Sequence, residues 1–126
     1  MKVIFKYSSP ESSSVTTFFF DPQKPLDFLA GQYVEVTLDH ENPDNRGIKR
    51  TFSISSSPKD KYISITTKTM VEKPSSFTKS LLQLKYGDLV DISSPKGSFT
   101  LPQDETIPLL FIAGGIGITT FHSMLT

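Results

Sequence analysis

Short segments in which apolar and polar residues alternate, each bounded by turn residues, constrain the fold of this chain most strongly. The alternation is clearest in residues 33–38, where Val34, Val36 and Leu38 share one parity. A period of two is typical of a strand with one buried face. Comparable patterns cover residues 2–7, 15–20, 49–55, 62–67 and 89–92. Closely spaced strands joined by short turns favour a small antiparallel barrel of six strands.

One helix is expected within this β pattern. Phe77, Leu81 and Leu84 recur at roughly helical spacing, directly after a pair of serines that can cap a helix start. Gly87 ends the pattern and the last strand follows it. The sequence therefore predicts a mainly β domain over residues 1–104, a six-stranded antiparallel barrel with one capping helix.

Composition removes several classes of function. The chain has 126 residues, which suits one domain, and 13 basic side chains balance 13 acidic ones. The zero net charge gives no global field for nucleic acid, so no nucleic-acid partner is expected. The absence of cysteine excludes disulfides, thiolate zinc sites and iron–sulfur clusters held by this chain. We find no signal peptide and no membrane-length apolar run, and we expect a cytoplasmic protein.

The two histidines do not predict a metal site. His40 lies in a polar loop, and His122 lies 82 positions further along the chain. Neither has a group of ligating residues near it in the sequence. Metal sites are built from several such side chains converging on one ion. No metal is therefore expected.

After residue 104 the pattern changes. Residues 109–113 form a continuous apolar run, as expected for a strand buried on both faces of a parallel sheet. A glycine-rich turn and a helical pattern follow, and strand, glycine-rich turn and helix together open a dinucleotide-binding unit. We therefore expect residues 105–126 to be the truncated βα start of an α/β nucleotide-binding domain, so that the chain is a piece of a longer protein.

Four motifs in one order give the chain a family resemblance. They are residues 31–34 (Gly-Gln-Tyr-Val), 50–53 (Arg-Thr-Phe-Ser), 84–88 (Leu-Lys-Tyr-Gly-Asp) and 114–119 (Gly-Gly-Ile-Gly-Ile-Thr). Together they resemble ferredoxin–NADP reductase-like flavoproteins, whose flavin signature is Arg-x-Tyr-Ser. The resemblance implies bound FAD, with FMN the less favoured flavin, and NAD(P)H as the co-substrate of the intact enzyme.

The resemblance also implies roles for particular residues. Arg50 would grip the cofactor pyrophosphate, since its planar charged fork suits phosphate oxygens. Phe52 would lie against the isoalloxazine ring, and Ser53 would hydrogen-bond near flavin N5 as the catalytic residue. The remaining cofactor-binding candidates come from the same motif, the next strand, the helix start and the glycine-rich turn: Thr51, Thr66, Lys68, Ser75, Ser76, Phe77, Thr78, Gly114, Gly115, Gly117 and Thr119.

The resemblance implies electron transfer from NAD(P)H through FAD to a separate electron-transfer protein or iron–sulfur domain, with this fragment inactive alone. The alternative is a non-catalytic β-barrel binding module that has lost flavin. In that case Arg50 and Lys68 are exposed charges, Phe52 is core and the serines only cap a helix. On a regular strand Arg50 and Phe52 face away from Thr51 and Ser53, so a bulge would be needed for all four to touch one cofactor.

Overall fold

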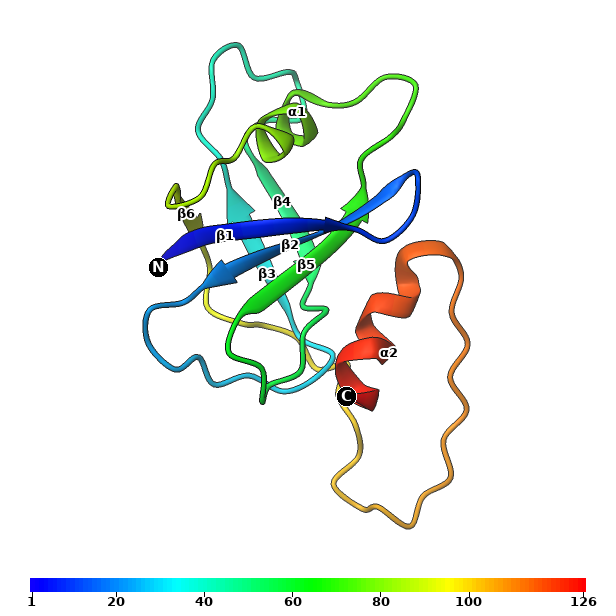
Figure 1. The fold of residues 1–126 in the computed structure, drawn as a ribbon. Coiled ribbons are helices and arrows are strands. Elements are labelled where there is room, and N and C mark those ends of the chain that lie inside the picture. The colour runs from blue at the N-terminus through cyan, green and yellow to red at the C-terminus, as the bar shows by residue number, and fades with distance from the viewer.

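The chain is built around one antiparallel sheet and two short helices (Figure 1). The computed structural model describes residues 1–126. The six strands are β1 (Lys2–Pro10), β2 (Val15–Asp21), β3 (Tyr33–Thr37), β4 (Lys49–Ser53), β5 (Ile63–Lys68) and β6 (Leu89–Ile92). The helices are α1 (Ser76–Leu82) and α2 (Ile118–Leu125), and a 3-10 turn, η1 (Gly115–Gly117), leads into α2.

The strands lie in the order β4-β3-β6-β1-β2-β5, and every pairing is antiparallel. The two edge strands come together just beyond β4, where Ile54 forms an isolated bridge with Ile65. The Ser55 amide extends this contact by donating to the Ser64 carbonyl over 2.9 Å. The predicted mainly β, six-stranded antiparallel architecture is confirmed. The sheet is barrel-like, but it is not a fully closed barrel.

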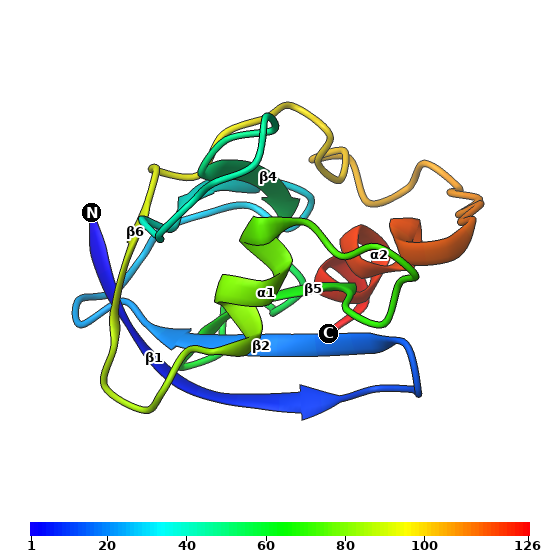
Figure 2. The same ribbon diagram turned by 90° about the horizontal axis from the view of Figure 1, so that it is seen from above.

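Seen from above, the strands curve around an interior, with α1 in front of it (Figure 2). The buried side chains of the strands form one hydrophobic cluster there. In β3, Val34 and Val36 are buried while Tyr33 is exposed, as the alternation predicts. Phe18 and Phe20 of β2 contribute two aromatic rings to the same cluster. The other strand residues of this core are Val3, Phe5, Ile63, Ile65, Val90 and Ile92, with Leu38 and Ile54 from the adjoining segments.

Helix α1 covers one end of the sheet and begins where the serine pair predicts. Ser75 is its N-cap, and its Oγ accepts a hydrogen bond of 3.1 Å from the Thr78 amide. Phe77 and Leu81, four residues apart, point into the core and are each 1% exposed. Burial of two large side chains, more than helix propensity, holds so short a helix in place.

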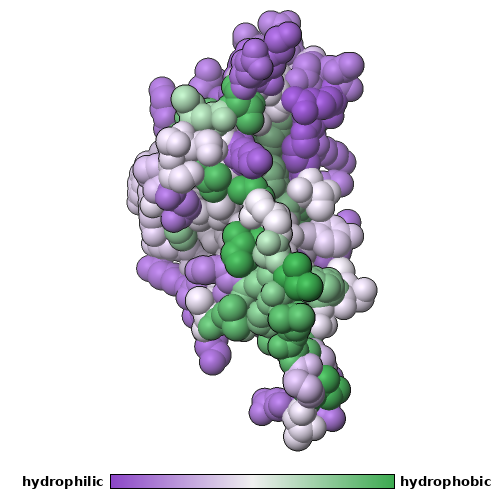
Figure 3. Space-filling view, turned by 90° about the vertical axis from the view of Figure 1, so that its right-hand side faces the viewer, coloured by the Kyte–Doolittle hydropathy of each residue, from purple (hydrophilic) through white to green (hydrophobic).

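The predicted strand over residues 109–113 is wrong. This segment has no regular secondary structure, and Leu110 and Ile112 are 84% and 80% exposed. A strand needs a neighbour for its backbone hydrogen bonds, and no strand of the sheet pairs with it. Figure 3 shows the resulting hydrophobic area on the face that carries this segment.

The predicted helix after the glycine-rich turn does form, as α2, and it packs against the barrel. Its Phe121 stacks on Phe111 with 4.6 Å between ring centroids. The barrel meets this region closely at Gly31, where an added Cβ would lie 1.8 Å from the Phe99 carbonyl oxygen and 2.7 Å from Met124. With φ at +104°, the position suits only glycine. Neither α1 nor α2 is long and apolar enough to cross a bilayer.

Candidate functional site

The inward face of β4 and the first turn of α1 form one side of the candidate site. Arg50 and Phe52 pair with Val36 and Val34 of β3, so they share the face of the sheet that looks toward α1. The Phe52 ring lies 5.9 Å from the Phe77 ring, and the Arg50 guanidinium carbon lies 5.2 Å from that ring's centroid. The Arg50 guanidinium therefore makes a cation–π contact with Phe77, and the Arg50 side chain is largely shielded from water.

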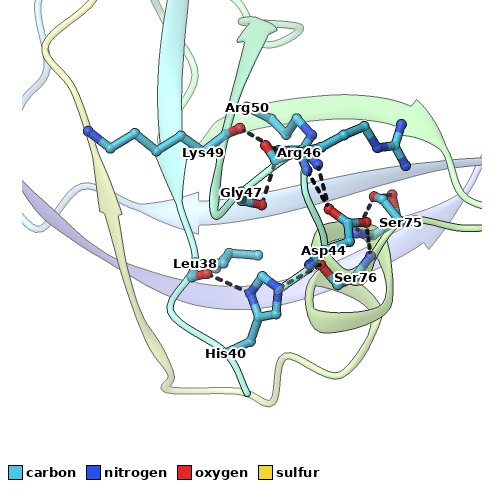
Figure 4. A network of polar contacts seen from close by, with 10 residues as sticks. Leu38, His40, Asp44, Arg46, Gly47, Lys49, Arg50, Ser75 and Ser76 are labelled. Carbon is cyan, nitrogen blue, oxygen red and sulfur yellow. Dashed lines mark hydrogen bonds and ion pairs between the residues drawn. The ribbon is translucent and has the colours of Figure 1, made fainter. Parts of the chain in front are cut away.

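The Arg50 guanidinium is held by backbone carbonyls at Nη1, whereas its Nη2 lies opposite the Asp44 carboxylate (Figure 4). Its Nη1 donates to the carbonyl oxygens of Arg46, Gly47 and Lys49, over 2.8, 3.3 and 2.6 Å. Its Nη2 is buried and has no hydrogen-bond partner. The nearest carboxylate oxygen, Oδ1 of Asp44, is 3.9 Å away. A buried charged donor without a partner is costly and marks a place where a ligand's oxygen would be stabilised.

Around the start of α1, a carboxylate from the loop between β3 and β4 takes part in the hydrogen bonding. Asp44 Oδ2 accepts from the Ser76 amide over 3.0 Å, and its Oδ1 accepts from the Arg46 amide over 3.0 Å. The Ser76 hydrogen bond, followed by the Arg46 amide and the charges of Arg46 and Arg50, holds the pKa of Asp44 below its usual value. The Asp44 carboxylate therefore already lies at the start of α1.

A groove of about 640 Å³ lies on the other side, between the β2–β5 pair and the C-terminal helix. Its size falls within the range of small-molecule sites, roughly 300–1,000 Å³. Thr66 and Lys68 of β5 line it, and Gly115 and Thr119 line it from the other wall. A smaller hollow of about 370 Å³, lined by residues 21–28, 58 and 60–63, contains none of the predicted site residues.

Hydroxyl groups build the floor of this groove. Ser55 Oγ lies 2.8 Å from Ser64 Oγ and accepts from Thr66 Oγ1 over 3.0 Å. His122 Nδ1 donates to the Ser55 carbonyl oxygen over 2.7 Å, and Ser123 Oγ donates to the Ser56 carbonyl oxygen over 2.6 Å. These bonds attach α2 to the barrel beside the end of β4.

Ser55, Ser64 and His122 also line the groove and were not predicted from the sequence. The dense serine run after β4 and the shared parity of Ser64, Thr66 and Lys68 were the available signals. They point to a polar strand face, but they do not say that α2 packs across it.

The predicted site residues thus fall into two groups. Arg50, Phe52 and the α1 start (Ser75, Ser76, Phe77 and Thr78) lie together, whereas Thr66, Lys68, Gly115 and Thr119 lie along the groove. Two other residues of the β4 motif belong to neither group. β4 pairs with β3 without a bulge, so Thr51 is exposed on the opposite face, and half-buried Ser53 makes no side-chain hydrogen bond within the chain. Gly114 and Gly117 lie in open space outside the groove lining.

Comparison with known proteins finds relatives among the flavohemoproteins. A flavohemoprotein of Bacillus thuringiensis subsp. konkukian is 35% identical over 122 residues, covering 91% of this chain and 30% of that protein. Flavohemoprotein A of Dictyostelium discoideum is 34% identical over 125 residues, covering 90% and 32%. The chain therefore spans about a third of the length of these relatives.

Solved structures share the fold. Ferredoxin-NADP+ reductase from Plasmodium falciparum superposes with a TM-score of 0.80 at 24% identity, covering 98% of this chain and 51% of that one. The flavohem-like FAD/NAD-binding domain of nitric oxide dioxygenase from Vibrio cholerae gives 0.80 at 23% identity, covering 98% and 54%. The sequence itself matches the oxidoreductase FAD-binding domain family over residues 2–101. The chain belongs to this family of FAD-binding domains of oxidoreductases.

Proposed function

We propose that this chain holds FAD with its phosphates at Arg50 and its flavin along the groove beside β5, as the flavin module of an NAD(P)H-dependent oxidoreductase. The bound flavin would supply hydride acceptance and the release of single electrons. The protein's contribution is to bind, orient and shield. No side chain of this site needs to act as an acid or base in that proposal.

The observation that carries the proposal is the unpaired Nη2 of Arg50. Its neighbour Nη1 is held by three carbonyls, so the guanidinium plane is fixed before any ligand arrives. A charged donor that is already held in place loses little conformational entropy when it binds a phosphate oxygen. Phe77 below the guanidinium helps to keep that orientation.

The groove accounts for the other half of the cofactor. It combines a hydroxyl-rich floor at Ser55, Ser64 and Thr66 with Lys68 in its lining. Hydroxyls can donate to or accept from the polar edge of a ring system, which suits a flavin better than a purely apolar slot would. Ser53, the last residue of β4, is outside the groove lining, and the hydrogen bond near flavin N5 that the motif implies for it is part of the same proposal.

The finer division of labour is part of the same proposal. Residues 1–104 would form the FAD-binding domain and residues 105–126 the start of an NAD(P)-binding unit. Gly114, Gly115, Gly117 and Thr119 would serve the nicotinamide nucleotide there, and electrons would pass to a separate carrier protein or iron–sulfur domain. Residues 1–126 contain no parallel sheet for a second nucleotide, so we expect this polypeptide to hold FAD without oxidising NAD(P)H.

The test is to purify the 126-residue chain, record its visible spectrum and identify any released cofactor by mass spectrometry. We expect a yellow protein, or a colourless one that becomes yellow with added FAD, and FAD in preference to FMN. A folded protein that stays colourless with both flavins would contradict the proposal. It would favour the alternative, a non-catalytic barrel whose Phe52, lacking a tyrosine hydroxyl, serves the core.

A further inference from the structure

The loop of residues 38–48, between β3 and β4, folds back onto the candidate phosphate site. The Leu38 amide closes it by donating to the Ile48 carbonyl over 2.9 Å. Within it, Asp44 reaches the start of α1 and also faces Arg50 (Figure 4). This loop therefore presents a negative charge at the place where the cofactor's own negative charge would bind.

Ser76 fastens the loop. Its Oγ accepts from the Asp44 amide over 2.9 Å, and its own amide donates to Asp44 Oδ2 over 3.0 Å. The same Oγ lies 2.9 Å from His40 Nε2, while His40 Nδ1 donates to the Leu38 carbonyl over 2.7 Å. Because the carbonyl can only accept, Nδ1 of His40 is the donor in that bond. These contacts hold the loop of residues 38–48 against the start of α1.

The contact between Asp44 and Arg50 is different, because it is close but not bonded. Oδ1 of Asp44 is 3.9 Å from Nη2 of Arg50, beyond hydrogen-bond distance, and Nη2 keeps its donors unused. A phosphate oxygen bonded to Nη2 would come within a few ångströms of the Asp44 carboxylate. Two like charges at such a distance repel each other unless one of them moves.

We propose that Asp44 is an internal anion that competes with the cofactor's phosphates for Arg50, so that the loop of residues 38–48 sets the affinity for FAD. This inference rests on the proposed function. In the free protein Asp44 partly balances the Arg50 charge and holds the loop on α1. Cofactor binding then requires the loop to release Asp44 or to tolerate the repulsion.

Removing the charge should therefore move two properties in opposite directions. Asp44→Asn keeps the size of the side chain but has only one acceptor oxygen for the Ser76 and Arg46 amides. We expect it to lower the melting temperature of the cofactor-free protein. We also expect it to bind FAD about 10-fold more tightly than the wild type, which corresponds to about 1.4 kcal/mol. If Asp44 only supported the fold, its replacement would lower both the melting temperature and the affinity for FAD.

The experiment is an equilibrium titration of cofactor-free wild type, Asp44→Asn and Asp39→Asn with FAD, alongside thermal melts of each. Asp39→Asn is the matched control: it makes the same charge change in the same loop, and its side chain makes no hydrogen bond or ion pair. We expect its affinity to stay within about 2-fold of the wild type. Asp44→Ala, which removes both the charge and the acceptor, should also bind FAD more tightly.

The outcomes distinguish a failure of the proposed competition by Asp44 from a failure of the proposed FAD binding. If the wild type binds FAD and Asp44→Asn binds it equally or more weakly, the competition does not exist. An equal gain in Asp39→Asn would also overturn it, because a general charge effect would then suffice. If the folded wild type and all three variants fail to bind FAD, the proposed function itself fails and the inference falls with it.

Discussion

Replacing Arg50 tests the phosphate site where its geometry is most specific. Nη2 is buried without a hydrogen-bond partner, whereas Nη1 is engaged by three carbonyls. A hydrogen bond to a charged group contributes about 1.5–3 kcal/mol, which is roughly a 10- to 150-fold change in affinity. We expect Arg50→Ala to weaken FAD binding by this factor. Arg50→Lys keeps the charge but not the fork, so it should weaken binding by about 10-fold.

The assay is the same FAD titration, with riboflavin as a second ligand because it lacks phosphates. Riboflavin affinity should change less than about 2-fold in both variants. Lys49→Ala is the matched control, since Lys49 precedes Arg50 but its ammonium faces Glu35, 3.8 Å away. Melting curves show whether loss of the Nη1 contacts unfolds the protein. Unchanged FAD affinity in a folded Arg50→Ala would refute the role of Arg50, as would an equal loss in Lys49→Ala.

Three further predictions concern stability. Gly31→Ala would force a Cβ against the Phe99 carbonyl at positive φ; we expect a loss of at least about 2 kcal/mol by urea unfolding, whereas Gly47→Ala, also at positive φ but with open space around it, should cost less. Phe77→Ala would leave a cavity beneath α1 and cost about 3–5 kcal/mol in the same assay; a cost below about 1 kcal/mol would contradict its buried position. The lowered pKa of Asp44 means that its charge stabilises the fold above its unfolded pKa of about 3.9, and that this contribution is lost as the pH falls through the lower folded value. Melts between pH 2 and 7 should therefore show a shallower acid loss for Asp44→Asn than for the wild type, and identical slopes would contradict this.

Much of the fold follows from local patterns. The alternation in β3 and the serine pair before α1 each predict an element, because burial of one face and capping of a helix start are decided by neighbours in sequence. Residues 109–113 show the limit of this reasoning. An apolar run indicates side chains that a strand could bury. A strand also requires a neighbouring strand for its backbone hydrogen bonds, and whether one is present depends on the rest of the fold.

The candidate site divides in the same way. The motif in β4 identifies Arg50 as a candidate ligand, since an arginine in that sequence context resembles a known signature. Its three carbonyl contacts and its unpaired Nη2 depend on how residues 46–49 turn, which side-chain patterns do not reveal. The contact of Asp44 with Ser76 joins residues 32 positions apart, and that of His122 with Ser55 joins residues 67 apart. Such pairs arise only when the sheet brings its ends together. The cytoplasmic location, expected because the sequence shows no signal peptide and no membrane-length apolar run, stays a prediction.

Titration of the cofactor-free wild-type protein with FAD, with visible absorbance and calorimetry as the readouts, shows directly whether this chain binds the flavin. The account predicts one FAD per chain, a protein-bound flavin spectrum distinct from that of free FAD, and weaker binding of riboflavin, because only FAD can use Arg50. A folded protein that binds no FAD, or that binds riboflavin as tightly as FAD, would contradict it.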